Sequence, residues 1–109
     1  MKINVFAEKM KMKILTGNSG LNRDITELYA CDLLSFVMSH GSRECGWITI
    51  HTHINTVAVA LMGEIPCIIV PEGIKEDEMT INKAIEEGIA ILSSDENSYN
   101  ICWKAHEIL

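Results

Sequence analysis

The sequence predicts a single α/β domain of three layers, in which helices flank a mainly parallel central sheet of about five strands. Short apolar or β-branched runs alternate with helical segments along the whole chain, which is the order of strand–helix–strand units. The run PCIIV, 66–70, is apolar throughout, as is typical of a strand buried on both faces of a parallel sheet. A length of 109 residues with 48% hydrophobic content suits one domain, so residues 1–109 are assigned to one unit.

The N-terminal segment is expected to contribute one helix and two strands. The helix covers 3–10, and a brief strand follows over 12–17. Gly17 and Gly20 then form a turn, because glycine accepts the backbone angles that tight turns need. The second strand is expected over 24–30.

A helix is expected after the second strand, with Asp32 as its N-terminal cap. Gly41 lies where a left-handed C-terminal cap is favoured. Apolar residues between these two positions repeat at helical spacing and predict one buried face: Leu33, Leu34, Val37 and Met38.

The middle of the chain repeats the order of strand and helix. The run GWITIH, 46–51, is β-branched and predicts a strand. Asn55 is expected to cap a helix over 56–62 that stops at Gly63. This helix has no polar face and therefore needs cover on every side, which a second subunit would supply. We expect a homodimer whose interface includes residues of this helix: Val57, Val59, Leu61 and Met62.

The last third of the chain is expected to contain a helix, a strand and a helix. The first helix ends at Gly88, and the run IAIL, 89–92, forms the last core strand. A final helix runs from about residue 96 to the end. The inner face of the first of these helices is expected to consist of Ile81, Ala84 and Ile85.

The acidic side chains are concentrated in one segment, 72–96. Its eight acidic and two basic side chains account for the whole formal net charge of −6. Glu76, Asp77 and Glu78 lie where a helix should begin, near the positive end of its dipole, and are expected to form a solvated face. The net charge also excludes the broad basic surface that non-specific nucleic-acid binding requires.

Cysteine spacing and hydropathy indicate the cellular setting. The most apolar window, 54–71, is interrupted by Gly63, Glu64 and Pro66, so no membrane span is expected. The N-terminus lacks an apolar signal stretch followed by a small-residue cleavage site. Together with widely spaced cysteines, this favours a reducing, cytoplasmic location. The cysteines form no CxxC pair: Cys31, Cys45, Cys67 and Cys102.

Polar side chains follow four of the expected strands at their C-terminal ends. The C-terminal ends of parallel strands line one edge of an open sheet, and ligands bind in the crevice there. We therefore predict a site for a small molecule, a nucleotide or a metabolite, at this edge. Its expected ligand-binding residues are Asp32, His51, Thr52, His53, Asn55, Glu72, Gly73, Ser93, Ser94 and Asp95.

His51 and His53 are separated by one residue, so both rings would point to the same face if the strand continues through them. Two imidazoles on one face are compatible with a metal site, for which these histidines are weak candidates. A third ligand does not follow from the sequence, because His40, Asp32 or Glu72 would have to be brought in by the fold. We therefore predict no metal site and keep a metal-dependent hydrolase that uses the two histidines as an alternative.

Motifs of nucleophilic or phosphoryl-transfer catalysis are absent from the sequence. The run GNSG, 17–20, is not followed by the GK[ST] of a P-loop. Ser93 and Ser94 lack the GxSxG of a nucleophile elbow. The chain is therefore not expected to be an enzyme.

Three segments resemble the DRTGG domain family: LTGNSGLNRDITELYACDLLSFVMSH at 15–40, WITIHTHINTVAVA at 47–60 and EEGIAILSSDENSY at 86–99. Together they span nearly the whole chain, and the middle segment is the most specific. Of the motif that names the family, three residues remain: Arg23, Asp24 and Thr26. The glycine pair that follows in the family is replaced by Glu27 and Leu28.

The resemblance implies one DRTGG-like domain over 1–109, with an α/β sandwich similar to the N-terminal domain of HPr kinase/phosphorylase and a tendency to form homodimers. Such domains occur in the middle of some phosphotransacetylases, beside CBS domains and as stand-alone proteins, and their role is regarded as regulatory. Kinase activity is not implied, since the P-loop belongs to another domain. Six positions match family segments at strand ends: Thr52, His53, Asn55, Ser93, Ser94 and Asp95.

These observations favour a non-catalytic regulatory module that binds a small molecule at the C-terminal strand edge and signals to a partner protein as a homodimer. The first alternative is a protein-interaction subunit without a ligand, which would use the apolar helix and an acidic face. The second alternative is the metal-dependent hydrolase. The sequence indicates no particular cofactor, ligand or partner.

Overall fold

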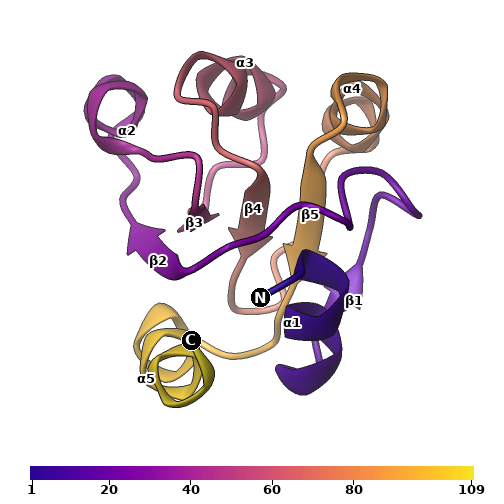
Figure 1. Cartoon of the computed structure of the whole chain (residues 1–109). Helices are drawn as coiled ribbons and strands as arrows, with labels where there is room; N and C mark the ends of the chain where they lie inside the picture. Colours follow the sequence, from indigo (N-terminus) through magenta and orange to yellow (C-terminus); the bar gives the residue numbers. More distant parts are fainter.

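The computed structural model describes residues 1–109 and contains one mixed sheet with helices on both faces (Figure 1). The strands are β1 (Lys13–Ile14), β2 (Glu27–Ala30), β3 (Cys45–Ile48), β4 (Cys67–Val70) and β5 (Ala90–Ser93). Their order in the sheet is β1-β5-β4-β3-β2. All neighbouring pairs are parallel except β1 and β5, which run antiparallel with Lys13 opposite Ser93. The prediction of a five-stranded, mainly parallel α/β domain is confirmed.

Five helices complete the fold and form the two outer layers. They are α1 (Ile3–Lys9), α2 (Leu34–His40), α3 (Asn55–Met62), α4 (Glu78–Glu87) and α5 (Ser98–Ile108). Figure 1 shows α2, α3 and α4 side by side above the sheet, with α1 and α5 below it. None of these helices combines the length and the apolar character that crossing a membrane would require.

Each face of the sheet has its own hydrophobic core, and β4 contributes to both. Cys67 and Ile69 pack on the face covered by α1 and α5, whereas Ile68 and Val70 pack on the opposite face. All four side chains are fully buried. The apolar run at 66–70 therefore formed the central strand that its sequence predicts, because alternate side chains of a strand point to opposite faces.

Trp47 of β3 is part of the core on the face covered by α2, α3 and α4. Its side chain is fully buried, and its indole N–H donates to the carbonyl oxygen of Cys31 at 2.8 Å. This bond satisfies the single polar atom of the indole and fixes the chain that leaves β2 against β3. The C-terminal ends of these two strands are thus held in register where the candidate site begins.

The glycines that follow α2 and α4 are required for different physical reasons. Gly88 follows α4 with φ of 70°, the left-handed conformation that glycine adopts easily. Gly41 follows α2 with φ of −67°, so the prediction of a left-handed cap there was wrong. A Cβ at Gly41 would lie 2.5 Å from Cδ1 of Ile65, and close packing explains the glycine.

Helix α3 is covered by its own chain on one side only. Val57 and Val59 are buried and leave no surface for a second subunit, which corrects their expected place in a dimer interface. Leu61 and Met62 are 40% and 67% exposed. Its neighbours α2 and α4 therefore cover only part of its circumference, and cover of the remaining side by a second subunit stays a prediction.

The expected inner face of α4 is also only partly confirmed. Ala84 is fully buried, but Ile85 is 46% exposed. Ile81 is half-buried and lines two surface cavities beside the start of the helix. The face that packs on the sheet is therefore narrower than the periodicity indicated, and Ile81 belongs to the rim of the candidate site.

Candidate functional site

The C-terminal edge of the parallel strands divides into two halves with different properties. The first, the histidine half, comprises Asp32 and the segment 49–55 that follows β3. The second, the β4–β5 half, comprises the loops 71–77 and 94–97 that follow β4 and β5. The residues predicted to bind a ligand are distributed over both halves.

Asp32 organises the histidine half from the end of β2. Its Oδ1 accepts hydrogen bonds from the hydroxyl of Thr49 at 2.8 Å and from the N–H of Ile50 at 2.9 Å. Nε2 of His51 lies 2.6 Å from the carbonyl oxygen of Asp32. Asp32 was predicted to cap α2, but Leu33 occupies that position without a side-chain bond. The carboxylate instead ties together the chain segments that leave β2 and β3.

His53 begins α3 in the role expected of Asn55. Nδ1 of His53 accepts from the N–H of Asn55 at 3.1 Å, and its carbonyl oxygen accepts from the hydroxyl of Thr56 at 2.9 Å. Asn55 is the first residue of the helix and makes no side-chain cap. The prediction of an asparagine cap was wrong because the turn before α3 places Nδ1 of His53 next to the free N–H of Asn55, so histidine supplies the acceptor.

The histidines do not form the pair that their spacing suggested. β3 ends at Ile48, so His51 and His53 lie beyond the strand and its alternation of side chains does not apply to them. No group of three or more His, Cys, Asp or Glu side chains lies close enough to hold a metal ion. One ring nitrogen of each histidine already has a partner in the chain. The geometry therefore gives no support to a metal-dependent hydrolase.

Backbone hydrogen bonds join the two loops of the β4–β5 half. The N–H of Glu72 donates to the carbonyl oxygen of Glu96, and that of Gly73 donates to Ser94, both at 2.8 Å. Glu72 and Gly73 have φ of 59° and 65°, so the chain turns sharply here. A Cβ at Gly73 would lie 3.2 Å from Oδ1 of Asp95. These bonds fix the two loops against each other, and Ser94 Oγ accepts a further bond from the N–H of Glu96 at 3.1 Å.

A cavity of about 340 Å³ lies at this half, where β1 and β5 meet the loop before α4. Two of the predicted ligand-binding residues, Gly73 and Ser93, line it. The sequence did not predict a ligand-binding role for the charged residues of this cavity, which are Lys13, Lys75 and Glu76. Lys13 reaches the cavity only because β1 pairs antiparallel with β5, and no local signal in the sequence reveals that pairing. The full lining is Lys13, Leu15, Gly73, Ile74, Lys75, Glu76, Ile81 and Ser93.

Glu76 is the unusual group of this cavity. It is 5% exposed; Oε1 accepts from the N–H of Asp77 at 3.0 Å, while Oε2 is buried without a hydrogen-bond partner. Burial disfavours the charged form and raises the pKa of Glu76 to about 7. The hydrogen bond from the N–H of Asp77 lowers this pKa and the negative charge of Asp77 raises it, but burial has the largest effect. Glu76 was expected on a solvated face, and that prediction was wrong.

One neighbouring cavity is more acidic than this one. A shallower one of about 540 Å³ shares Lys75 and Glu76 with it and adds the carboxylates of Asp77 and Glu78. The remaining predicted residues of this half, Glu72, Ser94 and Asp95, line neither cavity. The acidic first turn of α4 therefore borders the 340 Å³ cavity on one side only.

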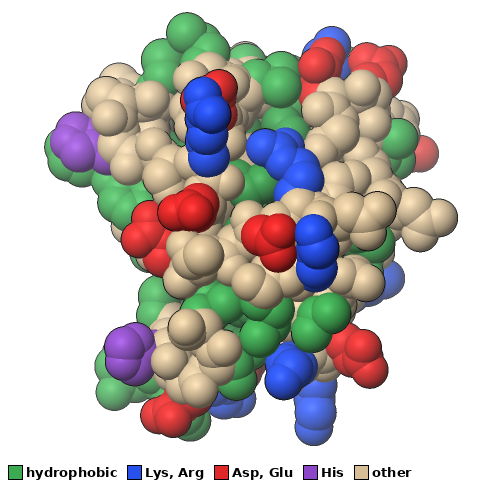
Figure 2. Space-filling model, in the orientation of Figure 1, with side chains coloured by type: hydrophobic (Ala, Val, Ile, Leu, Met, Phe, Trp, Pro, Cys, Tyr) green, Lys and Arg blue, Asp and Glu red, His purple; other side chains and the backbone are tan.

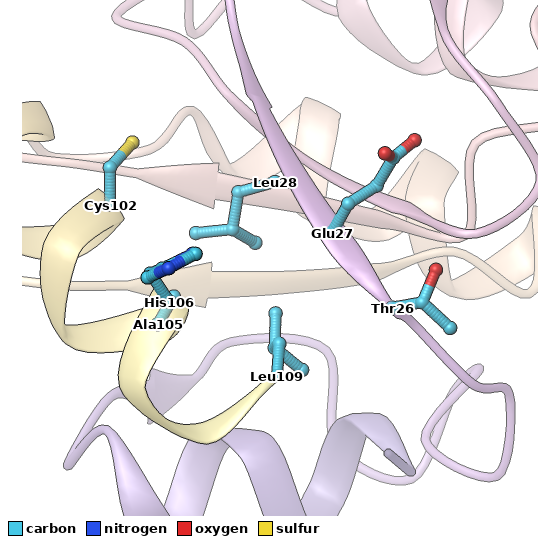
Figure 3. Close-up of a pocket in the computed structure, with 7 residues that line it drawn as sticks. All are labelled: Thr26, Glu27, Leu28, Cys102, Ala105, His106 and Leu109. Atoms are coloured by element: carbon cyan, nitrogen blue, oxygen red, sulfur yellow. The ribbon is translucent and has the colours of Figure 1, made fainter.

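Another cavity, of about 450 Å³, lies at the far edge of the sheet between β2 and α5 (Figure 3). Leu28 points toward α5, whereas Glu27 points to the other side of the strand (Figure 3). Cys102 and His106 lie one helical turn apart on α5, but burial raises the pKa of the Cys102 thiol and so disfavours the reactive thiolate. This surface shows no activated nucleophile.

Comparison with known proteins supports the fold. No family model matches the chain, and no curated protein matches it. The chain is similar to the crystal structure of the CBS and DRTGG domains of the regulatory region of Clostridium perfringens pyrophosphatase, complexed with the activator diadenosine tetraphosphate. The TM-score is 0.76 at 11% sequence identity, over 95% of this chain and 45% of that chain. The likeness establishes a shared fold, and this chain spans less than half the length of the similar structure.

Proposed function

We propose that this chain is a non-catalytic regulatory module of the DRTGG type that binds a small molecule at the β4–β5 half of the C-terminal strand edge. The observation that carries the proposal is the cavity of about 340 Å³ lined by Gly73 and Ser93. Its size lies at the lower end of the range for small-molecule sites, and its position beyond the strand ends is where open α/β sheets bind ligands.

The shared fold supports a regulatory role. The similar structure is a regulatory region of a pyrophosphatase, and it is complexed with a nucleotide activator. A nucleotide or a related metabolite is therefore the first class of ligand to examine for this chain. We propose that occupancy of the cavity is passed to a partner protein, as a regulatory role requires.

Thermal unfolding of the full chain with nucleotides and metabolites tests the proposal. A ligand at about 100 times its Kd stabilises the native state by about 2.7 kcal/mol, which for a domain of this size raises Tm by roughly 10 °C or more. Ser93→Phe fills the cavity and should abolish the shift, whereas Ser35→Phe, at an exposed position of α2, should leave it unchanged. A panel that never shifts Tm, or a shift that survives Ser93→Phe, would contradict the proposal.

A second candidate function, self-association through α2 and α3, is favoured by exposed apolar side chains on these adjacent helices. Figure 2 shows hydrophobic side chains on their outer surfaces, at the upper left and top. The exposed residues here include Leu33, Phe36, Met38, Leu61 and Met62. A second copy of the chain would cover them, and this face is the proposed homodimer interface.

Light scattering during gel filtration tests the homodimer. We expect a dimer at micromolar concentration and a monomer for Met62→Asp. Met79→Asp is the matched control, because Met79 is 71% exposed on α4, outside the proposed interface. A wild-type monomer, or a dimer that persists in Met62→Asp, would remove α3 from the interface.

A further inference from the structure

We propose that the 340 Å³ cavity binds the anionic group of its ligand, a phosphoryl or carboxylate group, between Lys13 and Lys75, with Glu76 in its neutral, protonated form. This inference rests on the proposed function and adds to it the chemistry of the ligand and a dependence on protons.

The two lysines line the cavity from different elements of the fold. Lys13 begins β1, directly opposite Ser93, and Lys75 lies in the loop between β4 and α4. Neither side chain forms an ion pair or a hydrogen bond within the chain. Two unpaired ammonium groups beside one concave surface attract a negative charge. A phosphoryl or carboxylate group is the anion that lysine commonly contacts in proteins.

Three of the five other lysines of the chain have acidic partners, whereas Lys9 and Lys11 have none. Lys2 pairs with Asp24, and Lys104 pairs with Glu96. Lys83 pairs with glutamates on its own helix. Lys13 and Lys75 share a cavity whose one carboxylate, Glu76, is too deeply buried to be a freely ionised partner. The positive charge at this cavity is therefore available to a ligand.

Glu76 controls the net charge of the cavity wall. The charged groups that line the two surfaces around it are Lys13 from β1, Lys75 and Asp77 from the loop, and Glu78 from α4. With Glu76 protonated, the two lysines are the only charged groups of the 340 Å³ cavity. Ionisation of Glu76 adds a negative charge beside the bound anion, which weakens binding.

The protonated carboxyl also supplies a donor. Oε1 already accepts from the N–H of Asp77, and Oε2 has no partner. In the neutral form one carboxyl oxygen carries a hydrogen, which is the hydrogen-bond donor that an anionic oxygen requires. Because burial raises the pKa of Glu76 to about 7, this form is populated near neutral pH.

The test measures anion binding to the full chain at two pH values by amide chemical shifts in NMR spectra. Sulfate, glutarate and 3′,5′-cyclic adenosine monophosphate serve as probes, and uncharged adenosine is the fourth. Sulfate and the cyclic nucleotide keep a constant charge across this interval, whereas glutarate becomes slightly more negative as the pH rises, which opposes the expected loss of affinity. We expect the anions to shift the amides of Gly73, Lys75 and Ser93. Affinity should be about tenfold weaker at pH of about 8 than at pH of about 6, because a group with a pKa of about 7 is mostly deprotonated at the higher value.

Variants assign the effect to the named groups. Lys13→Gln and Lys75→Gln should each weaken anion binding by about fivefold, the ratio typical of one exposed ionic contact. Lys9→Gln is the matched control, because Lys9 lies on α1 away from the cavity and should leave affinity unchanged. Glu76→Gln should keep the affinity and remove its pH dependence. Equal affinity of wild-type protein at both pH values, or unchanged affinity in both lysine variants, would overturn the inference.

The outcomes separate this inference from the proposed function. If adenosine shifts the cavity amides and the three anions do not, the cavity binds a ligand of other chemistry and the inference fails alone. If no probe and no compound of the thermal panel binds, both fail. The relative strength of sulfate, glutarate and the cyclic nucleotide distinguishes a phosphoryl from a carboxylate ligand.

A measurement on the wild-type chain tests the inference even if a variant does not fold. The carboxyl carbon resonance of Glu76 reports its protonation directly. Saturating sulfate should move its titration midpoint upward by linkage, because the anion binds the protonated form more tightly. A midpoint that is unchanged by sulfate would overturn the inference without any substitution.

Discussion

The two halves of the C-terminal strand edge carry similar polar residues but use them differently. In the histidine half, Asp32 accepts from Thr49 and Ile50, and His53 accepts from the first amide of α3. In the β4–β5 half, backbone bonds hold the loops, and the side chains of Lys13, Lys75 and Glu76 line a cavity without mutual partners. Polar residues at strand ends therefore indicate a ligand site only where the chain does not itself satisfy them.

The largest effect on stability is expected in the β4–β5 half, where Glu76→Gln should change how the free energy of unfolding depends on pH. Burial raises the pKa of Glu76 from 4.5 to about 7, so folding favours the protonated form. That contribution to stability is fully present below pH 4.5 and is lost as the pH rises through 7. The loss is on the order of 3 kcal/mol for a shift of this size.

Urea unfolding at several pH values checks this prediction. The wild type should lose stability between pH 4.5 and about 8 by more than Glu76→Gln does. Glu107→Gln, at an exposed position of α5, should follow the wild type. If Glu76→Gln and the wild type have the same pH slope, Glu76 ionises in the fold without cost and the two halves do not differ in this respect.

The next largest effect is expected in the histidine half, from Asp32→Ala. The substitution leaves the hydroxyl of Thr49, which is 1% exposed, and the N–H of Ile50 without their acceptor. The free energy of unfolding should fall by about 2 kcal/mol. Asp32→Asn keeps an acceptor oxygen and should lose less. Ligand affinity at the cavity should not change in either variant, and a change in Asp32→Asn would show that the halves are coupled.

A smaller loss of stability is expected from His53→Ala, which removes the acceptor that begins α3. Loss of a helix cap costs about 1 kcal/mol. His53→Asn supplies an oxygen at the same position and should recover most of it, as measured by urea unfolding. If ligand binding at the cavity is lost in His53→Ala while the protein stays folded, His53 acts in recognition and the cap is not its main role.

The smallest effect on stability is expected from Lys13→Gln. Lys13 is exposed and unpaired, so the free energy of unfolding should change by less than about 0.5 kcal/mol. Weakened sulfate binding in the same variant would show that this side chain acts in ligand binding. A large loss of stability would instead assign Lys13 a structural role in the β1–β5 pair.

The fold was predictable because its signals are local. The run 66–70 predicts a doubly buried strand, and Gly88 ends α4 in the left-handed conformation that its position indicates. Helix caps were less predictable, since Asp32 and Asn55 both have suitable side chains. Their actual roles depend on Thr49 and His53, which the tertiary structure places within reach.

The candidate site was predictable only in outline. The rule for open α/β sheets gives the edge at which this cavity lies and two of its lining residues, Gly73 and Ser93. Lys13 could not be assigned, because the sequence does not reveal which sheet edge a two-residue strand joins. Glu76 resembles any acidic residue near a helix start, and only the packing of its loop shows that it is buried.

The pairing of β1 with β5 joins the first strand of the chain to the last one, and the cavity forms at that junction. Most of the polypeptide lies between the two contributions, so the cavity is complete only after these distant segments have assembled. A molecule held there stabilises an arrangement with high contact order, and it should slow hydrogen exchange of the deepest amides as well as those beside it.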